Sequence, residues 1–152
     1  MSTTDNNQAE QLKTAVEAIL AEISQERERE IISRRFGLFD RRETLEQIGE
    51  MLGITRERVR QLEKAILVRL RLLVADGALT SVTSMEKVLT TNLVEMGRVA
   101  RIHDLANHIL ERDSEMTERS RVAFIAELVS TITIVNENDN YYQAAAIQSV
   151  GD

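Results

Sequence analysis

Basic and amide side chains recur along one face of residues 54–71, a segment with 6 basic and 2 acidic residues. On a helical wheel of about 100° per residue, polar side chains gather on one side and apolar ones on the other. The polar side consists of Glu57, Arg60, Gln61, Lys64 and Arg71. Arg and Gln can pair with purine edges, and Glu can accept a hydrogen bond from cytosine. This face therefore has the chemistry to read the major groove of DNA.

A short helix is predicted just before this segment. Leu45, Ile48 and Leu52 fall at helical spacing. Thr44 followed by Gln47 forms a capping box, which satisfies the free amides at a helix start. We expect the helix to begin near Leu45.

A glycine turn is expected to connect it to the second helix. Gly49 lacks a β-carbon where two helices must approach closely, and Gly53 can adopt the left-handed backbone that ends a helix. Thr55 can cap the second helix. The apolar face of that helix consists of Val59, Leu62, Ile66, Leu70 and Leu73. The pattern predicts a helix-turn-helix with one packed face and one exposed face.

The alternative is a solvated amphipathic helix whose arginines only keep the protein soluble. The apolar positions, two glycines, two caps and basic outer face agree over the 28 residues of 44–71, which favours the DNA-binding interpretation. Arg58 and Arg69 flank the exposed face, and like Arg71 they suit phosphate contacts. Lys64 is assigned to the bases.

Residues 23–73 resemble region 4 of primary bacterial sigma factors, the module that reads the promoter's −35 element. The matching motifs are RERE, RRFGL, TLEQIG, TRERVRQLE and RLR, in family order. Two departures are the FDRRE turn before Thr44 and Ala65 in place of a usual lysine, which is expected to reduce affinity. The melting region of sigma factors lies upstream of region 4, and only 22 residues precede the match, so we expect this chain not to be a complete sigma factor.

The resemblance implies roles for individual residues. It implies base contacts from Arg56, Glu57, Arg60 and Gln61, and phosphate contacts from Thr44 and Arg58. The implied partners are promoter-like double-stranded DNA and RNA polymerase, or another transcription protein. Docking to the polymerase β flap is expected near the hydrophobic residues of 31–38.

The net charge of −6 is unevenly distributed along the 152 residues. Residues 1–74 carry 13 basic and 13 acidic side chains, whereas residues 75–152 carry 6 basic and 12 acidic ones. The basic charge thus lies where the motif needs it. Without cysteines, a signal peptide or a membrane-spanning apolar run, the chain is expected to be cytoplasmic and nucleoid-associated, with no membrane partner.

The expected fold class is mainly α, with a helix-turn-helix bundle followed by a winged helix with a small β-hairpin. We assign residues 1–74 to the DNA-binding domain, in which a helix with Leu12, Val16 and Ile23 packs on the segment that follows. The small, polar residues 75–84 are predicted as a linker, and Gly77 as a helix stop. Residues 85–148 form the second predicted domain.

Three helices and a hairpin are predicted in this second domain. The helices have apolar periodicity around residues 85–96, 102–110 and 122–129, and TITIV and YYQAAAI are the strands, with residues 98–100 as a short third strand. Residues 85–147 resemble the HARE-type winged helix, which is also found in the delta subunit of some bacterial RNA polymerases. No lysine or arginine follows Arg121, and the wing carries Glu137 and Asp139, so phosphate would repel it. We interpret this domain as a protein-interaction module, against the simpler alternative of structural support.

Other chemistry is sparse. His103 and His108 do not share a helical face closely, and no cysteine or carboxylate cluster joins them, so no metal or cofactor is expected. The sequence has no phosphate loop or nucleophile motif, and the protein is predicted not to be an enzyme. Tyr141 and Tyr142 lack nearby cations and are expected to pack in the wing rather than to stack on bases.

The sequence therefore predicts a transcription regulator that reads promoter-like DNA. Two alternatives stay open: a polymerase-associated factor that uses both domains mainly for protein contacts, and the N-terminal part of a larger protein.

Overall fold

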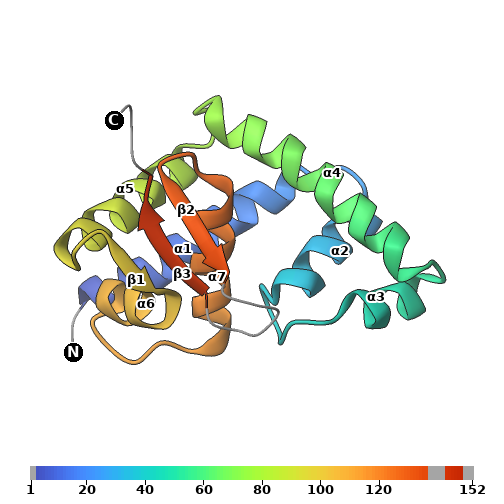
Figure 1. Cartoon of the computed structure of the whole chain (residues 1–152). Helices are drawn as coiled ribbons and strands as arrows, with labels where there is room; N and C mark the ends of the chain where they lie inside the picture. The colour runs from blue at the N-terminus through green and yellow to red at the C-terminus, as the bar shows by residue number, and fades with distance from the viewer. Residues whose placement is uncertain (1–2, 137–142, 149–152) are drawn as a thin grey trace.

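The computed structural model describes residues 3–136 and 143–148, and this part of the chain is mainly α-helical, as predicted. In the described residues, seven helices accompany a small antiparallel sheet (Figure 1). The helices are α1 (Thr3–Ala21), α2 (Glu26–Phe36), α3 (Leu45–Leu52), α4 (Arg56–Ala75), α5 (Thr80–Glu95), α6 (Ile102–Leu110) and α7 (Met116–Leu128). The strands are β1 (Val99–Arg101), β2 (Ile132–Asn136) and β3 (Gln143–Ile147). None of the described helices is long and apolar enough to cross a membrane.

Helices α2, α3 and α4 pack together at one end of the molecule, on the right in Figure 1. Ile31, Ile48 and Val59 come from the three helices and are fully buried against one another. Leu45 and Leu62 pack around them. Burial of these side chains holds the three helices in one arrangement.

The sheet and helices α5, α6 and α7 form the other end of the molecule. The strand order is β1-β3-β2, and Ala145 of β3 is opposite both Ala100 and Ile134. The predicted three helices, hairpin and short extra strand are therefore present. Helix α5 ends at Glu95, just before Gly97, whose φ of 92° turns the chain into β1. Glu137, Asp139, Tyr141 and Tyr142, on which the predictions about the wing depend, lie outside the described residues.

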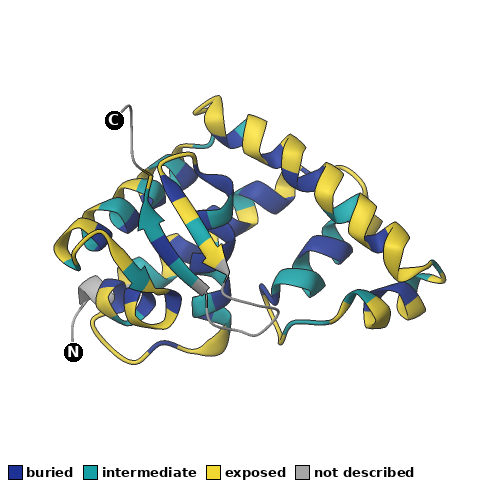
Figure 2. Ribbon diagram, viewed as in Figure 1, coloured by how far each residue is buried: buried dark blue, intermediate teal, exposed yellow. Residues whose placement is uncertain are grey.

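Helix α1 packs against α5, α6 and α7, which corrects the prediction that it packs on the segment directly after it. Its fully buried residues include Val16 and Ile19, which belong to the same hydrophobic cluster as Leu105 and Phe124. The physical reason is that the helices of the second half have apolar faces that the small sheet alone does not cover. Figure 2 shows α1 buried along much of its length behind the sheet.

The connection between α4 and α5 is shorter than the predicted linker. Ala75 is still in α4 and α5 already begins at Thr80, so residues 76–79 alone connect the two helices. Gly77 has a φ of 78°, consistent with the predicted helix stop. Val82 and Met85 explain why the helix starts early, since both side chains are buried in the core. The assignment of two domains stays a prediction, because one hydrophobic cluster contains residues from α1, α4 and α7.

Candidate nucleic-acid interface

The predicted caps are present at both helices of the motif. The Oγ1 atom of Thr44 accepts a hydrogen bond from the Gln47 amide at 3.1 Å, and Gln47 Oε1 accepts one from the Thr44 amide at 2.8 Å. Thr55 Oγ1 accepts a hydrogen bond from the Arg58 amide at 3.1 Å at the start of α4. These bonds satisfy amides that a helix start leaves without partners, so α3 and α4 begin at defined residues.

Two glycines form the turn for different physical reasons. A β-carbon on Gly49 would lie 2.7 Å from the Ile54 carbonyl oxygen, so no side chain fits between α3 and the chain that enters α4. Gly53 has open space around it but a φ of 71°, the left-handed region that L-residues rarely adopt. The amides of Gly53 and Ile54 both donate to the Gly49 carbonyl, which closes the turn.

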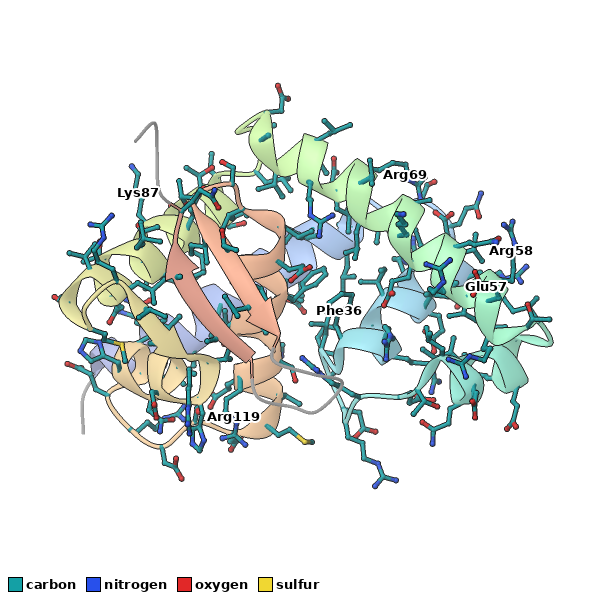
Figure 3. All side chains as sticks on the ribbon, in the orientation of Figure 1. Phe36, Glu57, Arg58, Arg69, Lys87 and Arg119 are labelled. Atoms are coloured by element: carbon teal, nitrogen blue, oxygen red, sulfur yellow. The ribbon has the colours of Figure 1, made fainter. Side chains whose placement is uncertain are left out.

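Helix α4 has the two faces that the sequence predicts. Val59, Ile66 and Leu70 are buried on its inner side. The predicted reading residues are all exposed, namely Glu57, Arg60, Gln61, Lys64 and Arg71. Figure 3 shows Glu57 and Arg58 on the outer side of the N-terminal half of α4, far from the sheet. A duplex could approach this half of the helix without meeting α5, α6 or α7.

Glu57 and Arg60 form an ion pair on the exposed face. The Nη2 atom of Arg60 lies 2.6 Å from Glu57 Oε1, and Arg60 Nε donates to Glu57 Oε2 at 3.0 Å. Hydrogen bonding from Arg60 lowers the pKa of the Glu57 carboxyl, and the same bond raises the pKa of Arg60. Both groups are therefore charged at neutral pH. The pairing orients the guanidinium and carboxylate side by side, where each can exchange a partner for a base edge.

The other arginines predicted to contact DNA differ in whether they already form an ion pair within the protein. Arg56 pairs with Glu46 of α3 at 3.0 Å, and Arg69 pairs with Glu28 of α2 at 2.7 Å. Arg58 is exposed, and its side chain has no ion pair among the described residues. In the first half of α4, Lys64 is likewise exposed without an ion pair among the described residues, and of these two cations Arg58 is the one that flanks the exposed face and suits a phosphate.

Arg71 lies at the border between the two ends of the molecule. Its Nη2 atom is 3.1 Å from Glu127 Oε1, and its Nε atom donates to the Glu127 carbonyl at 3.2 Å. A phosphate contact by Arg71 would have to compete with this carboxylate. The sequence pattern gave no sign of the pair, because 56 positions separate its two members.

The hydrophobic segment predicted to dock on a partner is covered by the chain itself. Ile31, Ile32 and Leu38 are fully buried, and the Phe36 ring lies 5.1 Å from the Phe124 ring of α7, centroid to centroid. The sequence marked these residues as apolar but could not show what covers them.

Two groups of polar residues near the motif were not predicted. Arg35 of α2 pairs with Glu63 of α4 at 2.9 Å, which locks these helices together beside their apolar contact. Arg41 and Arg42 lie just before the cap of α3, separated from Thr44 by Glu43, and Arg41 is exposed. Two adjacent arginines close to the start of α3 are a sequence signal for phosphate binding, because arginine is a common phosphate ligand.

Comparison with known proteins identifies the three-helix unit. Residues 25–72 match the family model of sigma-70, region 4. Residues 25–72 are a sigma-70 region 4 domain. Region 4 domains are DNA-binding helix-turn-helix modules that bind promoter DNA and RNA polymerase and are typically non-catalytic.

Whole sigma factors resemble this chain over part of its length. Two RNA polymerase sigma factors RpoD, from Helicobacter pylori strains 26695 and J99, are each 44% identical over 73 residues. The alignment covers 47% of this chain but only 11% of each RpoD protein. This chain therefore spans about a tenth of the length of the two RpoD proteins.

Proposed function

We propose that this protein is a transcription regulator that binds promoter-like DNA through its region 4 domain. The observation that supports this best is the exposed face of α4, where Glu57, Arg60, Gln61 and Lys64 project from a helix fixed by α2 and α3. The N-terminal half of α4 is long enough to lie in a major groove, and its side chains can bond to base edges.

We assign the contacts by side-chain chemistry and position. Arg56, Glu57, Arg60, Gln61 and Lys64 contact bases, and Thr44 and Arg58 contact phosphates on either side. Arg69 and Arg71 serve as phosphate contacts only after leaving Glu28 and Glu127, respectively. The DNA site is therefore centred on the first two turns of α4.

The second half of the chain is proposed to be a HARE-type winged helix that binds protein. Its element order, α5-β1-α6-α7-β2-β3, is that of a winged helix. Helix α7 is buried on most of its sides and contacts α1, α2 and α4. It is therefore a poor candidate for a second DNA-reading helix. RNA polymerase is the proposed partner of the protein, through the β flap for the region 4 domain.

A polymerase-associated factor that uses both halves mainly for protein contacts is the second candidate function. The pairing of Arg56, Arg60, Arg69 and Arg71 within the protein favours it, because each pair must be exchanged before DNA is bound. The chain could also be the N-terminal part of a larger protein, whose further activity would lie outside these residues. In each case the proposed location is the nucleoid.

Substitution of Arg60 by Ala tests the first candidate. Loss of one bidentate base contact should weaken binding to a promoter-like duplex by about 1–3 kcal/mol and relax the preference over a scrambled duplex. Fluorescence anisotropy on the two duplexes at several salt concentrations measures both effects.

Two controls separate readout from folding. Circular dichroism should show the Arg60→Ala variant as helical as the parent protein, since Arg60 is exposed and its ion pair is on the surface. Glu17→Ala changes an exposed helical residue on α1 and should leave DNA binding unchanged. If Arg60→Ala keeps the affinity and the sequence preference of the parent protein, α4 does not read bases through this residue.

A further inference from the structure

Besides the apolar core that it shares with α4, helix α7 presents three side chains to the end of α2 and the C-terminal half of α4. We call them the α7 cover: Arg121, Phe124 and Glu127. They are spaced three residues apart and so lie near one face of the helix. Figure 3 places Phe36 between the two ends of the molecule, where this face meets α2. The cover thus joins the region 4 domain to the second half of the chain.

Each member of the cover has a defined partner. Arg121 Nε donates to the Leu38 carbonyl at 2.9 Å, and its guanidinium carbon lies 5.4 Å from the centroid of the Phe39 ring. Phe124 packs on Phe36. The covered segment is therefore residues 36–39, just after α2.

The residues of the segment 36–39 differ in how far they are buried. Leu38 is fully buried and Phe36 is half-buried, whereas 47% of Phe39 is exposed at the border. The Phe124 ring of α7 thus shields Phe36, and Leu38 is buried in the hydrophobic core, whereas Phe39 remains partly exposed. An apolar partner segment could begin on Phe39 but could not reach Phe36 or Leu38 while α7 is in place.

The polar contacts of the cover are of a kind that can open. The Arg71 and Glu127 side chains keep 43% and 27% of their surface exposed, so water and salt weaken their attraction. Arg121 bonds to a backbone carbonyl at the end of a helix rather than to a buried charge. Local opening of such a contact costs less than global unfolding.

We propose that α7 is a reversible intramolecular cover over residues 36–39, and that the polymerase flap binds the region 4 domain only after displacing it. This inference rests on the proposed function, in which the flap docks near residues 31–38. The observed affinity for the flap is then reduced by the fraction of molecules in the open state. The second half of the chain thereby regulates the region 4 domain to which it is attached.

A thiol probe measures opening without any partner. The sequence has no cysteine, so Phe36→Cys introduces a single thiol under the cover. In this background, Arg121→Ala with Glu127→Ala should raise the rate of alkylation about tenfold, as expected from the loss of a charge-assisted hydrogen bond. An unchanged rate would overturn the cover.

Exchanging the charges of Arg71 and Glu127 tests their contact and at the same time controls for general unfolding. In the Phe36→Cys background, Glu127→Arg should speed alkylation, because two cations then face each other, and adding Arg71→Glu should slow it again. Recovery in the double variant cannot result from general unfolding. If the double variant reacts as fast as Glu127→Arg alone, this ion pair does not hold the cover closed.

Binding of a polymerase β-flap fragment tests the consequence in the full chain. Calorimetry should give a dissociation constant about tenfold lower for Arg121→Ala with Glu127→Ala than for the parent protein. The matched control, Lys87→Ala with Glu17→Ala, also removes one cation and one anion, both exposed and both outside α2, α4 and α7, and should bind like the parent.

The two readouts fail in different ways. If the thiol becomes reactive but the flap binds no variant, the docking part of the proposed function is wrong. If the flap binds the parent and the opened variant equally, α7 does not gate docking and the inference is wrong.

Discussion

Glu118 illustrates how a single carboxylate can stabilise the second half of the chain. Glu118 is only 7% exposed, and its two carboxylate oxygens accept hydrogen bonds from Arg112 at 2.8 and 2.7 Å. The Glu115 amide donates to it as well, at 2.8 Å, in the capping box of α7. The hydrogen bonds from Arg112, and then the Glu115 amide, lower the pKa of the Glu118 carboxyl despite its burial.

The pKa shift predicts the pH dependence of stability. Because the pKa of Glu118 is lower in the folded than in the unfolded protein, its contribution is present above the unfolded value near 4.5 and is lost as the pH falls through the folded value. Glu118→Gln should lower the free energy of unfolding by about 1–3 kcal/mol at pH 7. Urea unfolding of both proteins between pH 7 and about pH 3 measures the difference.

Unfolding at several pH values also tests whether the charge of Glu118 is the cause of the difference. The difference between Glu118→Gln and the parent should shrink as the pH falls below 4.5, since the parent loses the charge that the variant lacks. A difference that stays constant over the whole range would show that the carboxylate charge does not matter for stability.

The turn between α3 and α4 is where the sequence determines an element most strictly. Thr44, Gly49, Gly53 and Thr55 each meet a local requirement of a cap, a close approach or a positive φ. All four were predicted from residue type and spacing, because every interaction involved is within a few residues along the chain.

The two glycines of the turn should respond differently to substitution by Ala. Gly49→Ala brings a β-carbon against a backbone oxygen, so α3 and α4 must move apart, at a cost of about 1–3 kcal/mol. Gly53→Ala meets no atom and costs about 1–2 kcal/mol through its left-handed backbone alone. Thermal unfolding gives the stabilities.

Measurements of DNA binding further distinguish the steric effect of Gly49→Ala from the backbone effect of Gly53→Ala. Gly49→Ala should weaken binding even where the protein is fully folded, since the spacing of α3 and α4 changes. Gly53→Ala should bind normally at temperatures where it is folded. Equal binding by both variants and the parent would mean that the spacing of the helices is not critical for the interface.

At the scale of the whole molecule, the proposed DNA site is confined to one end. The side chain of Arg58 is exposed on α4, whereas Lys87 is an exposed cation on α5 at the opposite end (Figure 3). A phosphate contact contributes to affinity for any sequence and to its salt dependence, whereas a distant cation contributes little beyond the Debye length of about 8 Å in physiological salt.

Arg58→Ala should therefore weaken binding to promoter-like and scrambled duplexes alike, and lower the slope of log affinity against log salt by about one. Lys87→Ala should leave the affinity and the slope unchanged. Anisotropy titrations between about 50 and 200 mM salt measure both. A larger effect of Lys87→Ala than of Arg58→Ala would place the DNA on the other end of the molecule.

The local parts of this protein follow from its amino-acid sequence alone. The helix-turn-helix, its caps, the two faces of α4 and the order of helices and strands in the second half all depend on neighbours a few residues apart. The exposed face of α4 could be predicted for the same reason, because the helical period alone separates Glu57, Arg60 and Gln61 from Val59 and Ile66.

Which apolar face packs against which other face becomes visible in the folded chain. Val16 of α1 and Phe36 of α2 are apolar in a helical pattern, but the pattern does not say that α1 packs on the distant helices or that Phe124 covers Phe36. The sequence pattern predicts a phosphate contact for Arg71, but in the folded protein the side chain of Arg71 forms an ion pair with Glu127. Because the hydrophobic effect is non-directional, an apolar pattern predicts that a helix face is buried but does not predict its partner. The partner depends on the fold of the whole chain.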